Sequence, residues 1–375
     1  MHTAAATPPH GVRDGTALSH GTLTGHVRWP SMRLIGGKRD KVVVVTGASA
    51  GVGRAAAREF ARCGCDVALL ARNGEALDNA RAEVESHGQR ALAVPLDMSD
   101  ADAVESAALA IESQLGPIDV WVNNAMVTVF SPVALLRPEE VRRVTEVTYL
   151  GTVNGTLSAL HRMTSRNRGT IVQVGSALAY RSIPLQAPYC GAKAAIRGFT
   201  DSLRTELLHS GSRVRVTMVQ MPALNTPQFD WCRARVSHKP QPVPPIFEPE
   251  VAARAIVWAS RHQRREVFVG SSTVAAIWGN RFIAPLLDRY LARSAYRAQL
   301  APEPIEPNRR DNLWQTVPGD HGAHGRFTDR ASGSSRELWM STHRGLLVSA
   351  CAAGAGLLWM AAASGRSRRG HPHRH

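Results

Sequence analysis

The chain has 375 residues, of which 44% are hydrophobic and 20% are charged, and its formal net charge is +15. This hydrophobic content is typical of a globular protein with a substantial core and excludes a chain that is disordered throughout. Only four of the 45 basic residues are lysines, and no basic cluster is interleaved with aromatic residues, so the charge does not indicate a nucleic-acid-binding protein.

The five cysteines have no CxxC spacing, and their number is odd. They therefore indicate neither a disulfide framework nor a zinc site, and we expect reduced thiols in a cytoplasmic protein. The histidines near the C-terminus are flanked by glycine, proline and arginine, which is typical of a solvated tail, so we expect no metal centre.

Residues 1–37 are rich in threonine, histidine, glycine and proline and lack the apolar stretch of a signal peptide, so we expect a disordered extension. From residue 38 to residue 275, short apolar runs alternate with helical patterns. The strands that we predict are 41–46, 66–71, 90–96, 118–124, 170–175, 213–219 and 265–270. Because these runs are apolar on both faces, they predict an α/β domain with a doubly wound, Rossmann-like parallel sheet and helices on both faces.

Three further segments follow this domain. Residues 276–300 have an amphipathic helical pattern, and residues 301–340 are rich in proline, glycine and charge, as a linker is. Within residues 341–375, the stretch 346–363 carries no charge and reaches the lower length limit of a membrane-spanning helix. A membrane anchor, a docking helix and a disordered alanine-rich tail all remain open for it.

The first predicted strand runs directly into TGASAGVG (46–53) and then into a helical pattern. Glycines at 47, 51 and 53 let the backbone approach a pyrophosphate, and the start of the helix offers free N–H groups. This stretch therefore predicts a dinucleotide site.

A second stretch, GSALAYRSIPLQAPYCGAK (175–193), places Ser176 at the end of a strand. Tyr189 and Lys193 are four residues apart, so on a helix they share one face. A hydroxyl, a phenol and an ammonium in this arrangement suggest an active site, although each residue alone is equally typical of a strand-end cap, a core tyrosine and a solvated lysine.

Together, TGASAGVG, NNA (123–125), the Ser thirteen residues before YCGAK, and PALNT (222–226) resemble the short-chain dehydrogenase/reductase family over residues 38–270. The resemblance implies a single-domain Rossmann fold, a nicotinamide cofactor, a small-molecule substrate and a homo-oligomer. It also implies that Ser176, Tyr189 and Lys193 are catalytic. The cofactor-binding residues that it implies are Thr46, Gly47, Ser49, Gly51, Val52, Gly53, Arg72, Asp97, Asn123, Ala125, Tyr189, Lys193, Pro222 and Thr226.

The second strand ends at Ala71, where NAD-dependent members of the family usually carry an acid, and Arg72 follows. A guanidinium pairs with a 2′-phosphate that an acid would repel, so we expect NADP(H) rather than NAD(H). The chain has Thr148 where the family often has an asparagine of a proton relay, and we expect its hydroxyl to bond back to a helix carbonyl. Met126 replaces the glycine of the family's NNAG motif.

The loops expected at the carboxyl ends of the strands are apolar, which favours a lipophilic alcohol or ketone as substrate. The residues concerned are Leu178, Tyr180, Ile183, Leu185, Phe229, Trp231 and Phe247. Two alternatives remain: an epimerase or lyase that uses the same three catalytic residues, and a nucleotide-sensing or scaffold protein with little turnover.

Overall fold

The computed structural model describes residues 41–345 together with residues 349 and 359. The proposed N-terminal extension and, apart from two residues, the apolar stretch 346–363 lie outside this part of the chain. Among the described residues, no helix has the length and apolar character that crossing a membrane requires.

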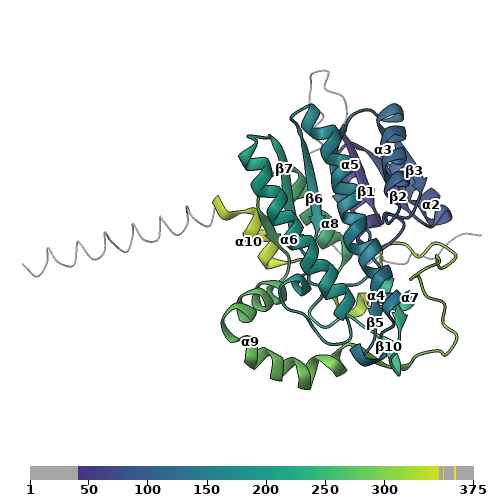
Figure 1. The fold of residues 1–375 in the computed structure, drawn as a ribbon, viewed down its shortest axis with the longest axis vertical. Coiled ribbons are helices and arrows are strands. Elements are labelled where there is room, and N and C mark those ends of the chain that lie inside the picture. Colours follow the sequence, from purple (N-terminus) through teal and green to yellow (C-terminus); the bar gives the residue numbers. More distant parts are fainter. Residues whose placement is uncertain (1–40, 346–348, 350–358, 360–375) are drawn as a thin grey trace, which may run out of the picture. The chain divides into compact units, whose positions relative to one another are not determined.

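A seven-stranded parallel sheet forms the centre of the fold (Figure 1), with the strand order β12-β7-β6-β4-β1-β2-β3. This arrangement confirms the Rossmann-like doubly wound sheet. The strands are β1 (Lys41–Thr46), β2 (Cys65–Ala71), β3 (Ala91–Pro95), β4 (Ile118–Asn123), β6 (Gly169–Val174), β7 (Val214–Gln220) and β12 (Glu266–Phe268). The direction of the order reverses between β1 and β4, where the carboxyl ends of parallel strands open a crevice.

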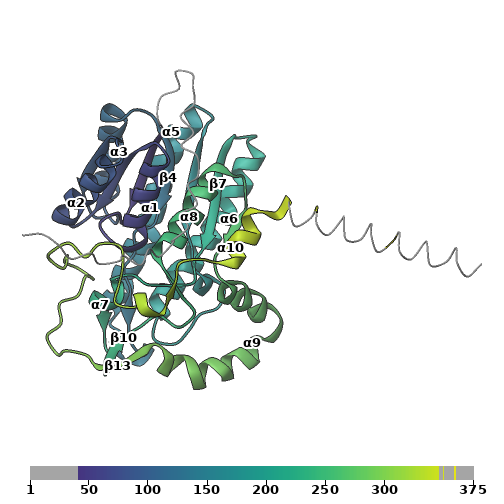
Figure 2. The same ribbon diagram turned by 180° about the vertical axis from the view of Figure 1, so that it is seen from behind.

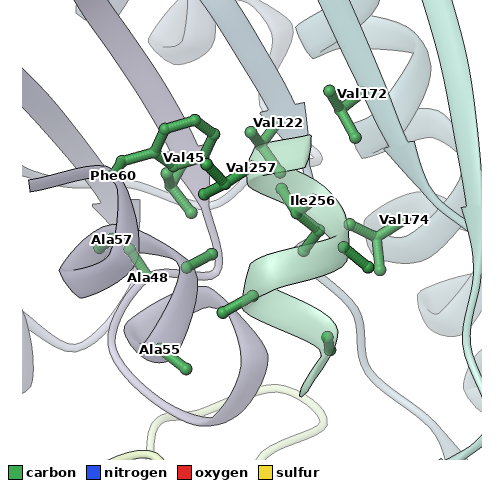
Figure 3. Close-up of a cluster of buried hydrophobic side chains, with 14 of the residues drawn as sticks. Val45, Ala48, Ala55, Ala57, Phe60, Val122, Val172, Val174, Ile256 and Val257 are labelled. Carbon is green, nitrogen blue, oxygen red and sulfur yellow. The ribbon is translucent and has the colours of Figure 1, made fainter. Parts of the chain in front are cut away.

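Helices cover both faces of the sheet, because successive side chains of each strand point to opposite sides. Val43 and Val45 of β1 pack with the helices of one face, and Figure 3 shows Val45 there, whereas Val42 and Val44 pack with those of the other. Figures 1 and 2 view the two helix layers from opposite sides. The first set is α1 (Gly51–Arg62), α2 (Gly74–Glu85) and α8 (Pro249–Arg261), and the second is α3 (Ala101–Gln114), α5 (Gly151–Ser165) and α6 (Ala187–His209).

Short elements build the region beyond the carboxyl ends of the strands. β8 (Ala223–Leu224), β11 (Ile246–Phe247) and β14 (Ala331–Ser332) form one small sheet, and two pairs join β5 (Val129–Phe130) to β9 (Arg233–Ala234) and β10 (His238–Pro240) to β13 (Leu300–Pro304). The helical elements there are η1 (Val133–Leu135), α4 (Pro138–Val144), η2 (Thr145–Leu150), η3 (Ala177–Ala179), α7 (Gln228–Trp231), η4 (Thr328–Arg330) and α10 (Arg336–Thr342).

The segment after β12 is helical, as its amphipathic pattern predicts. Helix α9 (Ser271–Ala298) covers residues 276–298 and is interrupted at Ile283, whose φ and ψ are −133° and 35°. Pro285 lies just beyond this point, and a proline removes a helix hydrogen bond and displaces the preceding turn.

Residues 301–340 differ from the linker that their composition suggests. Leu313, Ala323 and Phe327 are 0%, 3% and 1% exposed. Phe327 packs edge-on against Phe229, with 5.7 Å between ring centroids. This segment is ordered by a few buried apolar side chains and by many hydrogen bonds to its backbone. Composition alone does not reveal them, because proline, glycine and charged residues dominate the segment.

Replacing Phe327 with alanine tests whether this segment is part of the folded domain. Deleting a buried aromatic ring costs about 3–5 kcal/mol, so F327A is expected to lower the free energy of unfolding by that amount in chemical denaturation. Trp314→Ala in the same segment is the control, because Trp314 is 46% exposed and its loss is expected to cost far less. If both substitutions lowered the free energy of unfolding by the same small amount, the observed packing of Phe327 would be contradicted.

Candidate active site

The turn between β1 and α1 brings backbone against backbone. Gly47 has a φ of +67°, and a Cβ at this position would lie 2.8 Å from the Cα of Ala125. At Gly53 a Cβ would lie 2.1 Å from the carbonyl oxygen of Gly47. No larger residue fits at either position without moving the turn. The missing side chains leave the start of α1 as bare backbone.

Beside this turn lies a cleft that opens to solvent and has a volume of about 190 Å³. It extends along the carboxyl ends of β1, β2, β3 and β4 and the start of α1. Eight of the predicted cofactor-binding residues line it: Gly47, Ser49, Gly51, Val52, Arg72, Asp97, Ala125 and Thr226. Met126 lines it as well, so the chain accommodates this side chain in place of glycine.

Thr46 lies behind the cleft and connects the turn to the end of β4. Its Oγ1 accepts hydrogen bonds from the backbone N–H groups of Asn124 and Ala125, at 2.8 Å and 3.0 Å. The side chain of Asn124 donates in return to the carbonyl of Thr46 at 2.9 Å. Asn124 also lines the cleft, and the sequence analysis did not select it.

Asn123 was predicted to line the cofactor site, but its side chain lies inside the core, where it is 3% exposed. It accepts a hydrogen bond from Trp121 Nε1 and donates to Thr156 Oγ1 and Gln173 Oε1. Side chains alternate along a strand, so Asn123 and Asn124 face opposite directions. Because two asparagines stand side by side in the sequence, the motif alone does not show which side chain faces the cleft.

Arg72 follows β2 and forms part of the cleft wall. Its guanidinium donates to the carbonyls of Asn312, Leu313 and Trp314, at 2.5 Å, 3.3 Å and 3.1 Å. Burial lowers the pKa of Arg72, and the nearby Asp97 carboxylate opposes that shift. The group predicted to bind a phosphate is therefore held in place by backbone oxygens more than two hundred residues away.

Asp97 follows β3 and contacts a second arginine. One of its carboxylate oxygens accepts from Arg143, and the other accepts from the N–H and the hydroxyl of Ser99. Burial by itself would raise the pKa of Asp97, but the hydrogen bonds from Arg143 and Ser99 outweigh this effect and lower it. Asp97 is thus a carboxylate whose position is set before any ligand binds.

The structure brings Ser176, Tyr189 and Lys193 together beside the carboxyl end of β6. Ser176 follows this strand, and its hydroxyl accepts a hydrogen bond from the N–H of Leu178 at 3.1 Å and lies close enough to the phenol of Tyr189 to act on the pKa of that phenol. Lys193 Nζ lies 5.6 Å from the centroid of the Tyr189 ring and donates to the carbonyl of Val174 at 2.7 Å. Helix α6 carries the tyrosine and the lysine one turn apart on one face.

Burial shifts the pKa values of Tyr189 and Lys193. It raises the pKa of Tyr189, and the neighbouring Ser176 hydroxyl opposes this shift to a smaller extent. It also lowers the pKa of Lys193 to about 8. Both shifts favour the neutral forms, because a low-dielectric site disfavours charge.

Thr148 lies in η2, a π-helical turn between α4 and α5. Its hydroxyl does not bond back to a carbonyl of its own helix, as the sequence led us to expect. It accepts from the N–H of Val127 at 3.1 Å and donates to the carbonyl of Val127 at 3.0 Å. The π turn brings Thr148 within reach of the chain after β4.

The loop after β7 contributes Thr226 to the cleft, while Pro222 does not line it. In the same loop, Asn225 is fully buried and its side chain forms three hydrogen bonds. The Asn225 amide donates to Glu248 and Thr328 and accepts from the N–H of Phe327. Nothing in the local sequence distinguishes it, because all three of its partners are distant in the chain.

Several apolar residues expected around the substrate belong to the core instead. Leu185, Phe229 and Phe247 are 2%, 5% and 6% exposed, and the first two pack with Phe327. Trp231 lines the cleft, where it meets the ring of His321 edge-on at 4.5 Å between centroids. Leu178 and Ile183, on the loop after Ser176, are half-buried.

The family model described as short chain dehydrogenase matches residues 41–235. An uncharacterised oxidoreductase of Bacillus subtilis, YxnA, is 31% identical over 326 residues, which are 86% of this chain and 91% of that protein. A fatty acyl-CoA reductase of Acinetobacter baylyi is 28% identical over 64% of this chain and 79% of its own length.

A solved alcohol dehydrogenase from the archaeon Thermococcus sibiricus, complexed with 5-hydroxy-NADP, has a similar fold. It is 27% identical with a TM-score of 0.54, and the likeness covers 62% of this chain and 96% of that one. The sheet order, the glycine turn and these matches agree, and the chain is an oxidoreductase of the short-chain dehydrogenase/reductase family, whose members bind NAD(P).

Proposed function

We propose that the protein is an NADP(H)-dependent oxidoreductase that transfers a hydride between nicotinamide and a lipophilic alcohol or ketone. In this proposal Ser176, Tyr189 and Lys193 are the catalytic residues. The observation that carries it is their geometry: Ser176 follows β6 beside the Tyr189 phenol, and the buried Lys193 ammonium lies 5.6 Å from the centroid of the Tyr189 ring.

The cleft suits a dinucleotide because its floor is bare backbone. The glycine turn and the N-terminus of α1 offer N–H groups and a positive dipole end to a pyrophosphate. Gly47 and Gly51 would let the phosphates approach the backbone, and the Val52 N–H would hold them, because the N–H groups of Gly47 and Gly51 already donate to the carbonyls of Leu70 and Gly322. Thr226 would hold the nicotinamide end. When bound, the nicotinamide supplies or accepts the hydride.

The protein's own task is then to move a proton at the substrate oxygen. A raised pKa keeps Tyr189 a neutral phenol, the form that donates a proton when a ketone is reduced. Ser176 would donate a hydrogen bond to the same oxygen and orient it. Protonated Lys193 would favour the phenolate that remains after transfer and bond to ribose hydroxyls.

The preference for NADP(H) rests on Ala71 and Arg72. Ala71 presents no carboxylate to repel a 2′-phosphate, and the Arg72 guanidinium is part of the cleft wall. The Thermococcus enzyme carries an NADP derivative. A lipophilic substrate is supported by half-buried Leu178 and Ile183 next to Ser176 and by the relative that is a fatty acyl-CoA reductase.

Tyr189→Phe is the direct test of the catalytic assignment. It removes only the phenol oxygen, so we expect turnover of a ketone panel with NADPH to fall about 10²–10⁴-fold while NADPH affinity is retained. Tyr290→Phe is the matched control, because Tyr290 is 63% exposed on α9 and its loss of a hydroxyl is expected to leave turnover unchanged. Full activity of Y189F would overturn the proposal, and nucleotide binding without turnover in the wild type would favour a sensor.

Arg72→Ala tests the cofactor preference. A charge-assisted contact contributes about 1.5–3 kcal/mol, so NADPH affinity is expected to fall at least about tenfold further than NADH affinity in fluorescence titrations. Arg72 also holds residues 312–314, and for this reason the ratio of the two affinities is the measure. Arg81→Ala, at an exposed position of α2, is the control, and an unchanged ratio in R72A would exclude 2′-phosphate binding by Arg72.

Lys193→Met tests the burial of the ammonium in the protein without nucleotide. The pKa of about 8 lies below the unfolded value of 10.5, so below pH 8 folding forces a charge into the core at a cost of roughly 3 kcal/mol. K193M is expected to unfold at higher temperature than the wild type at pH 7. The difference should shrink between pH 8 and pH 10.5, where the folded wild type has lost the proton.

Lys41→Met, at an exposed position, is the control and should leave the melting temperature nearly unchanged. If K193M were less stable than the wild type at pH 7, the ammonium would be better solvated or paired than the structure indicates.

A further inference from the structure

We propose that residues 312–322, called the strap below, are the outer half of the dinucleotide site and limit the rate at which nucleotide leaves it. The strap lies in the segment whose composition suggested a linker (Figure 2, yellow-green). The inference rests on the proposed function, because it concerns the nucleotide of the same cleft. It adds a binding element outside the span that the family model matches.

The first end of the strap is fixed by two arginines and one apolar side chain. Arg72 binds the carbonyls of Asn312, Leu313 and Trp314, and Arg143 donates to that of Leu313 at 3.1 Å. The Leu313 side chain is fully buried among valines of β5, α4 and the neighbouring turns. This end is therefore held by Arg72, which follows β2, and by Arg143 of α4, which also contacts Asp97 after β3.

The middle of the strap faces the cleft. Thr316, Val317 and His321 line it, and the ring of His321 packs against Trp231 on the opposite side. Asn73 holds the backbone here by donating to the carbonyls of Val317 and Gly319, both at 3.2 Å. The strap thus forms a wall of the cleft and leaves the space beneath it open.

The second end is fixed at the glycine turn. Asp320 accepts from both terminal nitrogens of Arg54, at 3.1 Å and 3.2 Å, and Arg54 is 1% exposed. The carbonyl of Gly322 accepts from the N–H of Gly51 at 3.0 Å. This contact supplies an acceptor at the start of α1, where the N-cap residue Ala50 has no side-chain oxygen.

The strap therefore spans from Arg72 and Arg143 to the turn before α1 and is fixed at both ends. A dinucleotide in the cleft touches the glycine turn and the end of β2, so it lies beneath the strap. Its release requires these hydrogen bonds and ion pairs to break. The strap is expected to slow release and, by contact with the nucleotide, to strengthen binding.

Asp320→Asn weakens one end of the strap without altering the cleft lining. Wild type, D320N and Glu306→Gln are loaded with NADPH, and its release is followed by stopped-flow fluorescence after a chase with excess NADP⁺. Glu306 is the control because it forms an exposed ion pair with Lys239 just before the strap. We expect release at least fivefold faster from D320N, with weaker NADPH affinity, and a wild-type rate from E306Q.

Leu313→Ala is the second variant. It weakens the first end of the strap, so it is also expected to speed NADPH release. Equal release rates in the wild type, D320N and L313A would overturn the strap inference and leave the proposed function intact. Tighter NADPH binding by D320N would also overturn it, because the strap would then compete with the nucleotide. If the wild type binds neither NADPH nor NADH, the proposed function fails, and the strap inference fails with it.

Discussion

The close contact between the glycine turn and the end of β4 is the constraint on which the rest of the site depends. A Cβ at Gly53 would lie 2.1 Å from the Gly47 carbonyl, so this turn is closed by backbone alone. Thr46 then ties it to Asn124 and Ala125 with two hydrogen bonds. The start of α1, the cleft and the chain leading to Thr148 all take their positions from this contact. The same lack of side chains that lets the turn close gives a phosphate access to the helix N-terminus.

Paired arginines are the second feature that organises the molecule. Arg54 is buried, Arg72 and Arg143 are half-buried, and each is held by carboxylates or carbonyls from distant parts of the chain. An unpaired buried guanidinium is costly, so these partners are needed for stability as well as for shape. Arg72 fixes the first end of the strap, and in the proposed function it would also offer its charge to a 2′-phosphate.

The sequence predicted the sheet closely, because strands buried on both faces are nearly continuous apolar runs. All seven predicted strands are present within about two residues of their expected ends. The glycine turn and the residues after β6 were also predictable, since their spacing is local. The structure places Tyr189 and Lys193 on one face of α6, as their spacing suggests, and brings Ser176, just after the end of β6, close to them.

What the sequence did not reveal depends on contacts across long separations. Composition concealed the ordered structure of residues 301–340, because Leu313 and Phe327 are isolated apolar residues among proline and charge. The NNA motif indicates the end of a strand but not the direction of each side chain, so it could not show that Asn124 rather than Asn123 lines the cleft. The role of Asn225 as a link to the C-terminal segment follows only from tertiary structure.

The central claim is that a nicotinamide dinucleotide binds between the glycine turn and the strap. Hydrogen–deuterium exchange of the full chain with and without NADPH tests this most directly. The account predicts joint protection of residues 46–53, 72–73 and 312–322, with little change along α9. Protection of the glycine turn without the strap, or no protection in either segment, would contradict it.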